Sequence, residues 1–374
     1  MICLVAGTRP NFVKIAPIWR ALVKRSLPVR ILHTGQHFDP GMSDVFFREL
    51  GLPEPDMTLR MEGRSHAEVT AAVLVGAEAD FLQYRPDVVV VVGDVNSTLA
   101  AALAAAKLET LLVHVEAGLR SRDWTMPEEI NRVLTDQLAD LLLVPSLDAR
   151  KNLLAEGISE ERIVFVGNVM IDSLHDSLTR PTDALQRFDL VGQQFALVTM
   201  HRPVNVDSGP GLAKICDALE VISRRLPVVF PIHPRTIERI EAYGLSDRIR
   251  ALSQVRLIPP LGPNDFVTLL ARATLVATDS GGVQEETTAL GIPCLTMREN
   301  TERPITVTEG TNTLVGLDLD RIEHEMDVIL SGQGKRGRVP EGWDGQTGER
   351  IASAIYALLD GTPPAKRARR FSRD

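Results

Sequence analysis

The chain has 374 residues, more than one ordinary hydrophobic core accommodates and enough for two domains. Hydrophobic residues account for 44% and charged residues for 24%, which is typical of a globular protein and excludes a disordered or fibrous chain. The formal net charge of -8 argues against a nucleic-acid partner, because binding a phosphate backbone leaves a basic footprint. A small anionic ligand is compatible with this charge, since it needs only a few local cations.

Short β-branched apolar runs alternate with longer amphipathic segments along the first half. Each run predicts a buried parallel strand followed by a helix, and the Ala-rich stretch from Leu99 to Ala106 predicts a crossover helix. The predicted strands are ICLVA (2–6), VRILH (29–33), DVVVVVGD (87–94), TLLVHVE (110–116) and a short strand at 163–166. The alternation predicts right-handed βαβ units in a doubly wound sheet.

The pattern restarts after a polar connection at 176–193. The second series of predicted strands is QFALVTMH (194–201), PVVFPIH (227–233), QVRLIP (254–259), TLVATDS (274–280) and IPCLTM (292–297). The expected fold class is α/β, with two Rossmann-like domains that face each other across a cleft and bind a ligand at the carboxyl ends of the strands. We expect an N-terminal domain over 1–170, a C-terminal domain over 171–360 and a flexible basic tail over 361–374.

Cysteine usage and the apolar runs indicate the compartment. Cys3, Cys216 and Cys294 lie far apart and match no metal-ligand spacing, which suits a reducing cytoplasm. The apolar part of the N-terminus is too short for a signal peptide, and no run is long enough to span a membrane. We therefore expect a cytoplasmic protein with no membrane partner.

Two glycine-containing turns at strand ends are candidate anion sites. The first is GTRP at 7–10, followed by a helix that carries Lys14; it has neither a Walker A ending nor the GxGxxG fingerprint. Arg9 and Lys14 would supply positive charge there. Solvated arginines and lysines are common, so this turn by itself is an ambiguous signal.

The second turn is TDSGG at 278–282, which opens a predicted helix. Without side chains, Gly281 and Gly282 let backbone N–H groups approach a diphosphate, and Ser280 adds a hydroxyl donor. Glu286, one turn into the helix, is placed to accept hydrogen bonds from ribose hydroxyls. A tight turn followed by a solvated acidic helix face is the alternative interpretation.

Carboxylates end two successive predicted strands of the first half. Asp94 and Glu116 occupy these strand ends, and Glu128 and Glu129 open the predicted helix PEEINR. Converging carboxylates repel one another, which raises their pKa values and suits general acid–base catalysis. We expect one of the two adjacent glutamates to serve the helix N-terminus electrostatically instead.

Histidines end two predicted strands of the second half. A lone histidine is more often structural, but His201 and His233 at two such ends favour a functional role, and Arg303 adds a cation to the same rim. The sequence contains no HExxH, GxSxG or zinc-deaminase pattern. The residues therefore favour acid–base chemistry on a diphosphate ligand, with no metal, cofactor or covalent nucleophile.

Taken together, the motifs resemble the non-hydrolysing UDP-N-acetylglucosamine 2-epimerases over nearly the whole chain. In chain order they are GTRPxxxK, TGQH, GDxNSTLA, HVEAGLR, MPEEINR, VGNVMIDS, HRPxN, HPRT, TDSGGVQEE and TERP. The resemblance implies a GT-B-type fold, a UDP-sugar substrate, a homodimer and a last helix that crosses back to the first domain. It also implies a place in cell-surface polysaccharide biosynthesis.

The resemblance further implies roles for individual residues. The candidate substrate-binding residues are Arg9, Lys14, His233, Phe266, Ser280, Gly281, Gly282, Glu286 and Arg303, and the candidate catalytic residues are Asp94, Glu116, Glu128 and His201. The implied reaction eliminates UDP across C1–C2 to give a 2-acetamidoglucal, and UDP adds back after a proton returns to the opposite face of C2. We expect Asp94 and Glu128 to carry the two proton transfers, with Glu116 and His201 in supporting roles.

Four alternatives stay open from the sequence. They are an epimerase of a related UDP-hexosamine, a hydrolysing 2-epimerase, a GT-B glycosyltransferase and a non-catalytic UDP-sugar sensor. The sensor is disfavoured because pure binding gains nothing from several acids near a diphosphate. A glycosyltransferase would need an acceptor groove rather than three carboxylates crowded around the sugar.

Overall fold

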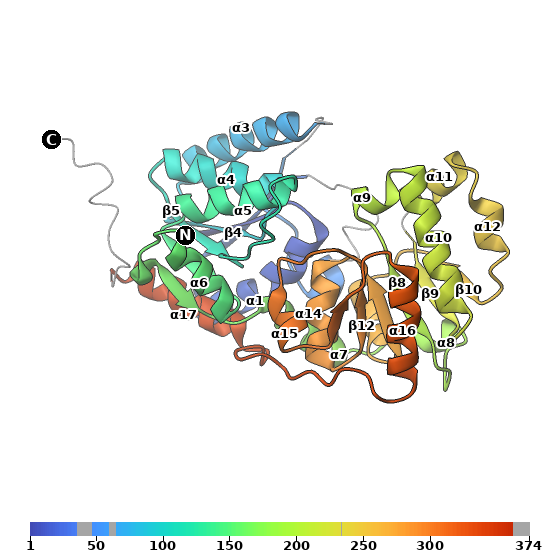
Figure 1. The fold of residues 1–374 in the computed structure, drawn as a ribbon. Helices are drawn as coiled ribbons and strands as arrows, with labels where there is room; N and C mark the ends of the chain where they lie inside the picture. The colour runs from blue at the N-terminus through green and yellow to red at the C-terminus, as the bar shows by residue number, and fades with distance from the viewer. Residues whose placement is uncertain (36–46, 60–64, 233, 362–374) are drawn as a thin grey trace. The chain divides into compact units, whose positions relative to one another are not determined.

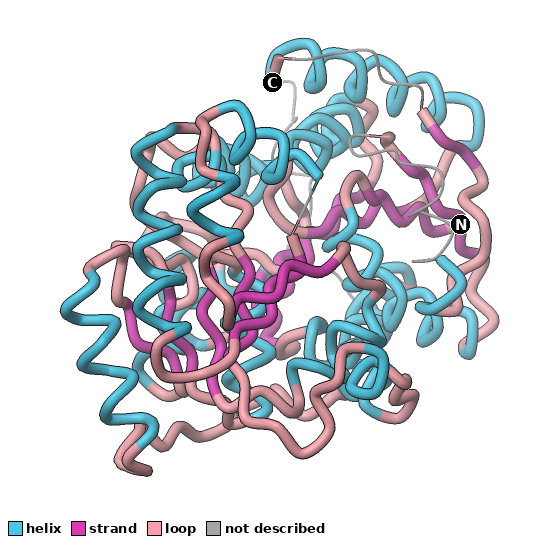
Figure 2. Tube along the Cα trace, turned by 90° about the vertical axis from the view of Figure 1, so that its right-hand side faces the viewer, coloured by secondary structure: helices cyan, strands magenta, loops and turns pink. Residues whose placement is uncertain are grey.

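Two parallel β-sheets form the scaffold of the protein. The computed structural model describes residues 1–35, 47–59, 65–232 and 234–361. It divides into unit 1, which comprises Met1–His175 and the chain from Glu341 onward, and unit 2, which comprises Asp176–Pro340. Each unit alternates strands with helices that cover both faces of its sheet (Figures 1 and 2), so the expected α/β class with two Rossmann-like domains is confirmed.

The sheet of unit 1 is entirely parallel, with the order β3-β2-β1-β4-β5-β6-β7. Its strands are β1 (Ile2–Ala6), β2 (Val29–His33), β3 (Met57–Thr58), β4 (Val88–Val92), β5 (Leu111–Val115), β6 (Leu141–Val144) and β7 (Ile163–Phe165). Its helices are α1 (Arg9–Lys24), α3 (His66–Tyr84), α4 (Asn96–Lys107), α5 (Pro127–Leu138), α6 (Leu147–Ala155), η1 (Glu160–Arg162) and α17 (Thr347–Leu359), and α7 (Val169–Leu178) leads out of the unit.

Unit 2 repeats this plan with the parallel order β10-β9-β8-β11-β12-β13. Its strands are β8 (Ala196–Thr199), β9 (Val228–Pro231), β10 (Val255–Ile258), β11 (Leu275–Thr278), β12 (Cys294–Thr296) and β13 (Asn312–Leu314). Its helices are α8 (Ala184–Arg187), α9 (Pro203–Val206), α10 (Gly209–Ser223), α11 (Pro234–Ala242), α12 (Ser246–Arg250), α13 (Pro263–Leu270), α14 (Gly281–Leu290), α15 (Pro304–Thr308) and α16 (Leu319–Leu330).

Strand β4 shows why the apolar runs become buried strands. Its five valines alternate between two cores, because successive strand residues point to opposite faces of the sheet. Val88, Val90 and Val92 join the core beneath α1 and α17, whereas Val89 and Val91 join the core beneath α3 and α4. Only a strand covered on both faces is continuously apolar, and this is the pattern of a parallel sheet.

Three short strands lie outside the predicted set. Strand β6 extends the sheet of unit 1 between β5 and β7, and β13 forms an edge of the sheet of unit 2. The two-residue strand β3 pairs with β2 through Leu32–Met57 and His33–Thr58. Their sequences, LLLV, NTL and MT, are too short to show a period, so pairing with a neighbouring strand decides their structure.

The last described helix, α17, belongs to unit 1. The backbone N–H groups of Thr347 and Gly348 donate to the carboxylate of Asp172 at 3.1 and 2.7 Å, which satisfies donors that a helix N-terminus leaves without partners. Helix α17 then packs along α1 and buries Ile351 and Ile355 in the shared core. The unit boundaries accordingly fall at 175/176 and 340/341, since these contacts return the end of the chain to unit 1.

Among the described residues, no helix combines the length and the apolarity that crossing a bilayer requires.

Candidate active site

Each unit has a topological switch point, and the candidate residues gather at these two places. In unit 1 the strand order reverses between β1 and β4, and in unit 2 it reverses between β8 and β11. Helices leave the carboxyl ends of these strands in opposite directions, which opens the crevice where doubly wound sheets bind ligands. Gly7 and Asp94 follow β1 and β4, whereas His201 and Asp279 follow β8 and β11.

The turn after β1 is tied down by a side chain that the motif analysis missed. Asn11 accepts hydrogen bonds through Oδ1 from the backbone N–H groups of Gly7 and Thr8, at 3.1 and 3.0 Å. Its Nδ2 donates to the carbonyl of Val92 at 3.1 Å, so Asn11 joins the ends of β1 and β4. These two backbone donors are therefore engaged within the protein, and any anion binding here depends on side-chain cations instead.

Lys14 and Glu116 form a buried ion pair. Lys14 comes from α1 and donates through Nζ to Oε2 of Glu116, which directly follows β5. The two side chains are only 9% and 7% exposed, so each charge is balanced by the other where water cannot solvate it. The backbone of Glu116 adopts a φ of +70° and donates to the carbonyl of Leu143 at 3.1 Å. One predicted cation and one predicted carboxylate thus hold each other in place.

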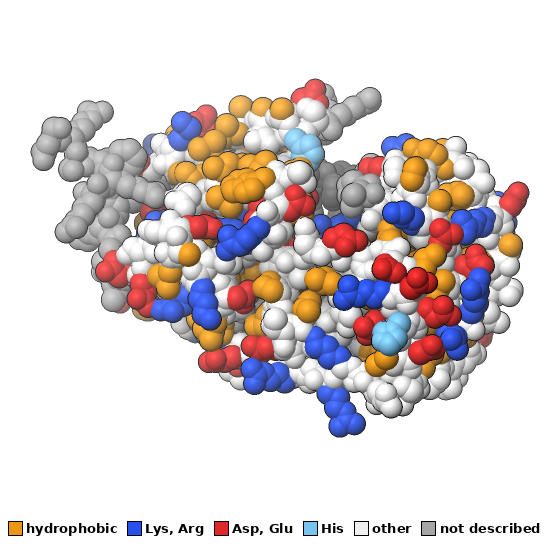
Figure 3. All heavy atoms as spheres, in the orientation of Figure 1, with side chains coloured by type: hydrophobic (Ala, Val, Ile, Leu, Met, Phe, Trp, Pro, Cys, Tyr) orange, Lys and Arg blue, Asp and Glu red, His pale blue; other side chains and the backbone are white. Residues whose placement is uncertain are grey.

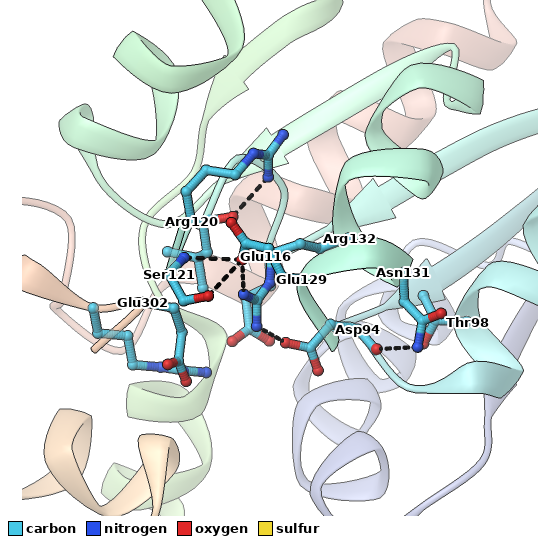
Figure 4. Close-up of polar contacts among 12 residues, drawn as sticks. Asp94, Thr98, Glu116, Arg120, Ser121, Glu129, Asn131, Arg132 and Glu302 are labelled. Carbon is cyan, nitrogen blue, oxygen red and sulfur yellow. Dashed lines mark hydrogen bonds and ion pairs between the residues drawn. The ribbon is translucent and has the colours of Figure 1, made fainter. Parts of the chain in front are cut away.

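Arg132 connects Asp94 to Glu129 (Figure 4). Its guanidinium group donates to Oδ2 of Asp94 through one nitrogen and to Oε2 of Glu129 through another. The same helix, α5, also holds the turn after β4, because Nδ2 of Asn131 donates to the carbonyl of Asp94 at 2.9 Å. The side chain of Asp94 remains 26% exposed, so its carboxylate is both anchored and accessible.

The two adjacent glutamates at the start of α5 have different environments. Glu129 is buried and accepts hydrogen bonds from the backbone N–H groups of Ser121 and Arg122, at 2.9 and 2.8 Å. Burial acts to raise the pKa of Glu129, but these hydrogen bonds and Arg132 hold it below its usual value. Glu128 is half-buried and has no hydrogen-bond or ion-pair partner among the described residues. Glu129 therefore fixes the preceding loop, and Glu128 is the member that is free to act on a ligand.

In unit 2, Asp279 organises the turn that carries His201. The buried carboxylate of Asp279 accepts from the backbone N–H groups of His201 and Arg202 at 3.1 and 3.0 Å, and from Nδ2 of Asn205 at 2.9 Å. Nδ1 of His201 lies 3.3 Å from Oδ1 of the same carboxylate. The imidazole is 57% exposed. Its Nδ1 edge is thus oriented by Asp279, which leaves Nε2 as the nitrogen that can meet a ligand.

The first turn of α14 lies against Arg303. A Cβ atom on Gly281 would stand 2.3 Å from a guanidinium nitrogen of Arg303, so the close approach requires glycine. The backbone N–H groups of Gly281 and Gly282 have no acceptor among the described residues. Ser280 is the N-cap residue of this helix and is half-buried. A helix N-terminus beside an arginine favours an anion, because the macrodipole and the cation act in the same direction.

Buried carboxylates surround this arginine. Nε of Arg303 donates to Glu285 at 2.7 Å, and Glu302 accepts from both Arg303 and Arg298. Burial acts to raise the pKa of Glu302, but the neighbouring arginines hold it well below its usual range. Burial and the charge of Glu285 raise the pKa of Glu286 to about 8, so this carboxyl group is largely protonated at neutral pH. The carboxylates of Glu285 and Glu302 thereby hold the arginines in place. The protonated Glu286 can donate as well as accept a hydrogen bond.

The remaining candidates lie in less informative positions. Phe266 is half-buried on α13 and packs against the core beneath α14, and Arg9 is half-buried at the first position of α1. His233 lies outside the described residues. In the part of the chain that the structure describes, no three histidine, cysteine or acidic side chains are grouped to hold a metal ion.

Comparison with known proteins identifies the family. A sequence model of the UDP-N-acetylglucosamine 2-epimerase family matches residues 20–356. The UDP-N-acetylglucosamine 2-epimerase of Methanocaldococcus jannaschii is 41% identical over 95% of this chain and 98% of that protein. The crystal structure of the Methanocaldococcus jannaschii UDP-GlcNAc 2-epimerase in complex with UDP-GlcNAc and UDP superimposes with a TM-score of 0.89, covering 95% of this chain and 99% of that one at 41% identity. The chain belongs to the UDP-N-acetylglucosamine 2-epimerase family.

One relative in this comparison is named for a different sugar. The UDP-2,3-diacetamido-2,3-dideoxy-D-glucuronate 2-epimerase of Pseudomonas aeruginosa is 44% identical over 96% of this chain and 99% of that protein. Both names describe inversion at C2 of a UDP-linked sugar. These relatives therefore agree on the reaction but differ in the substituents of the sugar.

Several structural residues of this epimerase were not singled out from the sequence. They are Asn11, His114, Asn131, Arg132, Asp136, Asp279 and Glu302, and each is buried and joins two segments by hydrogen bonds or ion pairs. Arg132 follows Glu129 by three residues, a spacing that places two helical side chains side by side and could have indicated their ion pair. Glu302 and Arg298 are four residues apart, a spacing that likewise could have indicated an ion pair. Each of the other five residues has a partner far away in sequence, and such a pair leaves no local signal.

Proposed function

We propose that this isomerase interconverts UDP-GlcNAc and UDP-ManNAc by eliminating UDP and adding it back. A base removes the C2 proton, the electron pair of the C2–H bond forms the C1–C2 double bond, and the C1–O bond breaks to release UDP. An acid then protonates C2 from the opposite face while UDP returns to C1. The C2 proton is not α to a carbonyl, so elimination offers a route that direct deprotonation does not.

The observation that carries this proposal is the attachment of α5 to the turn after β4. Helix α5 carries the glutamate pair in its first turn and is bonded to Asp94 through Asn131 and Arg132. One rigid connection therefore holds Asp94 and Glu128 at the same edge of the sheet. We assign the two proton transfers to these carboxylates, which supply a base and an acid without a change in the protein backbone.

The other acidic and basic groups support this chemistry. Arg9 supplies a cation at the unit 1 switch point, where an anionic leaving group benefits from it. Lys14 is assigned to the same substrate-binding set, and its ion pair with Glu116 holds both side chains in place. His201, oriented by Asp279, is assigned a supporting acid or electrostatic role.

Unit 2 supplies the features that a UDP moiety requires. We assign the diphosphate to Ser280, Gly281, Gly282 and Arg303, because open backbone donors and a fixed guanidinium group stabilise negative charge. The ribose is assigned to Glu286, the uracil to Phe266, and His233 to the same substrate-binding set. Holding UDP during the reaction prevents its escape after the C1–O bond breaks.

Proton NMR of the purified protein with UDP-GlcNAc in D₂O tests the proposal. A new UDP-ManNAc anomeric signal, together with deuterium at C2 of both sugars, is the expected result. Free ManNAc and UDP would show a hydrolysing enzyme instead. If the UDP-GlcNAc spectrum does not change, UDP-2,3-diacetamido-2,3-dideoxy-D-glucuronate is the next substrate to add, because a relative with 44% identity is named for it. Turnover of that sugar, with none of UDP-GlcNAc, would identify the diacetamido sugar as the substrate instead.

A homodimer is part of this proposal, and α3 supports it. This helix buries Val73, Ala77 and Phe81 against the sheet, but it also exposes Val75 and Leu82, at 66% and 58%. A helix that is apolar on both faces is typical of one covered on both sides. Figure 3 shows hydrophobic side chains gathered on this face of unit 1, over α3 to α5. Trp124, Ile130 and Leu134, which lie on or just before α5, add to the exposed apolar surface, and α5 packs against α4.

A second copy of the same chain fits this surface. If two α3 helices pack antiparallel about a two-fold axis, each apolar stripe meets the other, which is the self-complementarity of an isologous interface. The same arrangement places Glu68, exposed near the start of α3, beside Arg85, exposed at the end of α3 in the other copy. We also place the protein in the cytoplasm, consistent with three cysteines that are all buried and reduced.

A further inference from the structure

His114 is a buried histidine whose two ring nitrogens both face hydrogen-bond acceptors. It lies in β5, two residues before Glu116, and its side chain is inaccessible to solvent. Nδ1 is 2.7 Å from Oδ1 of Asp136, and Nε2 is 2.9 Å from the carbonyl oxygen of Gly93. Neither the sequence motifs nor the proposed reaction gives this residue a role.

This geometry determines where the protons are. A neutral imidazole has a single N–H donor, so one of its nitrogens would direct a lone pair at an acceptor oxygen. The carbonyl of Gly93 cannot donate. A protonated Asp136 could donate to Nδ1, but its carboxylate is stabilised as an anion by the backbone N–H of Gly118 at 3.1 Å and the guanidinium group of Arg120 at 2.8 Å. The imidazole therefore carries both protons.

The surrounding charges balance this cation. Asp136 comes from α5, Arg120 from the loop after β5, and Glu156 from the end of α6, where it accepts from Arg120 at 2.8 and 2.6 Å. With His114 protonated, two cations and two anions form one network, in which His114, Arg120 and Asp136 are buried and Glu156 lies at the surface. Buried charges are tolerated when they are paired and hydrogen-bonded in this way.

The bond to Gly93 reaches the proposed catalytic residues. Gly93 has a φ of +72°, a conformation that favours glycine, and it is followed by Asp94. Its N–H donates to the carbonyl of Val115 at 3.1 Å, so both polar backbone groups of Gly93 are held by β5. On the other side, Asp136 holds the N–H of Gly118, two residues after Glu116. One imidazole thus links the turn of Asp94 to the loop of Glu116.

We propose that His114 is a positioning residue: an imidazole that donates from both ring nitrogens and thereby fixes the backbone on which Asp94 and Glu116 are presented. It does not touch substrate, and its effect on turnover rests on the function proposed above. Loss of the bond to Gly93 leaves a buried carbonyl without its donor and lets the Asp94 turn relax. A misplaced catalytic group slows the chemical step more than it weakens substrate binding. We therefore expect loss of this bond to lower kcat and to leave KM nearly unchanged.

The first test is the protonation state of His114, which needs no substrate. In the full-length protein labelled with ¹⁵N-histidine, both ring nitrogens of His114 are expected to show the chemical shifts of protonated nitrogens at pH 7.5. Asp136→Asn is the matched variant, because its amide would donate to Nδ1 while its carbonyl keeps Gly118 and Arg120. In that variant His114 is expected to become neutral, with its proton on Nε2. A neutral His114 in the unaltered protein at pH 7.5 would overturn the proposal.

The second test is kinetic. Glutamine carries both of its side-chain N–H donors on one nitrogen, so His114→Gln cannot reproduce donation from two separate ring nitrogens. We therefore expect kcat for the C2 inversion to fall at least tenfold while KM changes less than threefold. The control is His324→Gln, which replaces an exposed histidine of α16 in unit 2. Unchanged kcat in folded His114→Gln would refute the positioning role. If His114→Gln does not fold, the NMR comparison with Asp136→Asn decides. An unaltered protein with no epimerase activity refutes the proposed function but leaves the protonation test intact.

Discussion

Oδ1 of Asp279 lies 3.3 Å from Nδ1 of His201, and the same carboxylate accepts a hydrogen bond from the backbone N–H of His201. The two residues follow neighbouring strands, β8 and β11, whose carboxyl ends meet at the switch point of unit 2. The buried carboxylate thus sets both the turn and the orientation of the ring. The same principle recurs in unit 1, where Arg132 and Lys14 hold the carboxylates of Asp94 and Glu116.

Asp94→Asn and Glu128→Gln are each expected to lower kcat at least about a hundredfold, which is the usual scale for losing a general acid or base. UDP should still bind, because its proposed ligands belong to unit 2. Steady-state kinetics and calorimetric titration with UDP measure the two effects. Turnover close to that of the unaltered protein would remove the substituted residue from the catalytic set.

Glu129→Gln is the matched comparison for Glu128→Gln. Glu129 binds Arg132 and two backbone N–H groups, so its replacement should lower the melting temperature, whereas Glu128→Gln should leave it nearly unchanged. Thermal unfolding of both variants measures this difference. A larger loss of stability in Glu128→Gln than in Glu129→Gln would contradict the assignment of the pair.

The Lys14–Glu116 pair predicts strong coupling. Lys14→Met and Glu116→Gln each remove one partner, and Lys14→Met in particular leaves a buried charge uncompensated, at a cost of about 3–5 kcal/mol in unfolding free energy. The double variant should lose less unfolding free energy than the two single variants lose together, because no buried charge remains. A double-mutant cycle in urea measures this coupling, and additive losses would show that the pair is not energetically linked.

Glu286 predicts a pH dependence of stability. Its pKa is raised to about 8 by burial and by Glu285, so the folded state holds a proton that the unfolded state releases above its ordinary value of 4.5. The stability contributed by this proton is complete below pH 4.5 and is lost as the pH rises to 8 and above. Glu286→Gln should therefore be more stable than the unaltered protein at pH 8.5 and should show a shallower decline from pH 6 to pH 8.5. Parallel pH profiles of the two melting temperatures would contradict the raised pKa.

Gly281→Ala tests the proposed diphosphate site. The new methyl group would stand 2.3 Å from a guanidinium nitrogen of Arg303, which is already held by two carboxylates and has little freedom to move. Affinity for UDP should fall at least about tenfold, since a displaced charge-assisted donor costs about 1.5–3 kcal/mol. Gly334→Ala is the control, because its nearest neighbours would stand at 3.3 Å. Equal UDP affinities of the two variants would argue against this site.

The exposed face of α3 predicts the oligomeric state. Val75→Glu combined with Leu82→Glu places charges on the apolar stripe and should convert a dimer into monomers, because like charges would meet across the two-fold axis. Light scattering coupled to size exclusion measures the mass. Lys214→Glu changes an exposed charge on α10 of unit 2, outside the helices of unit 1, and should leave the dimer intact. A dimer that survives the double substitution would place the interface elsewhere.

The sequence by itself determined the architecture and most of the chemical inventory. Runs such as the five valines of β4 predict strands covered on both faces, because a short, β-branched and continuously apolar run between turns is typical of a buried parallel strand. Residues at the ends of such strands, including Asp94, Glu116 and His201, must then lie along one edge of each sheet. The order of the motifs also sufficed to indicate the family.

Only the tertiary structure decided which of these residues are free and which are engaged. Lys14 and Glu116 are separated by 102 residues, and no local pattern indicates that they neutralise each other. Glu128 and Glu129 are adjacent, yet a helix turns by about 100° per residue, so one enters the core and the other does not. The two polar partners of the His114 ring likewise lie 21 and 22 residues away in sequence. Hydrogen bonds and ion pairs act over a few ångströms in space, and folding, not sequence spacing, sets those distances.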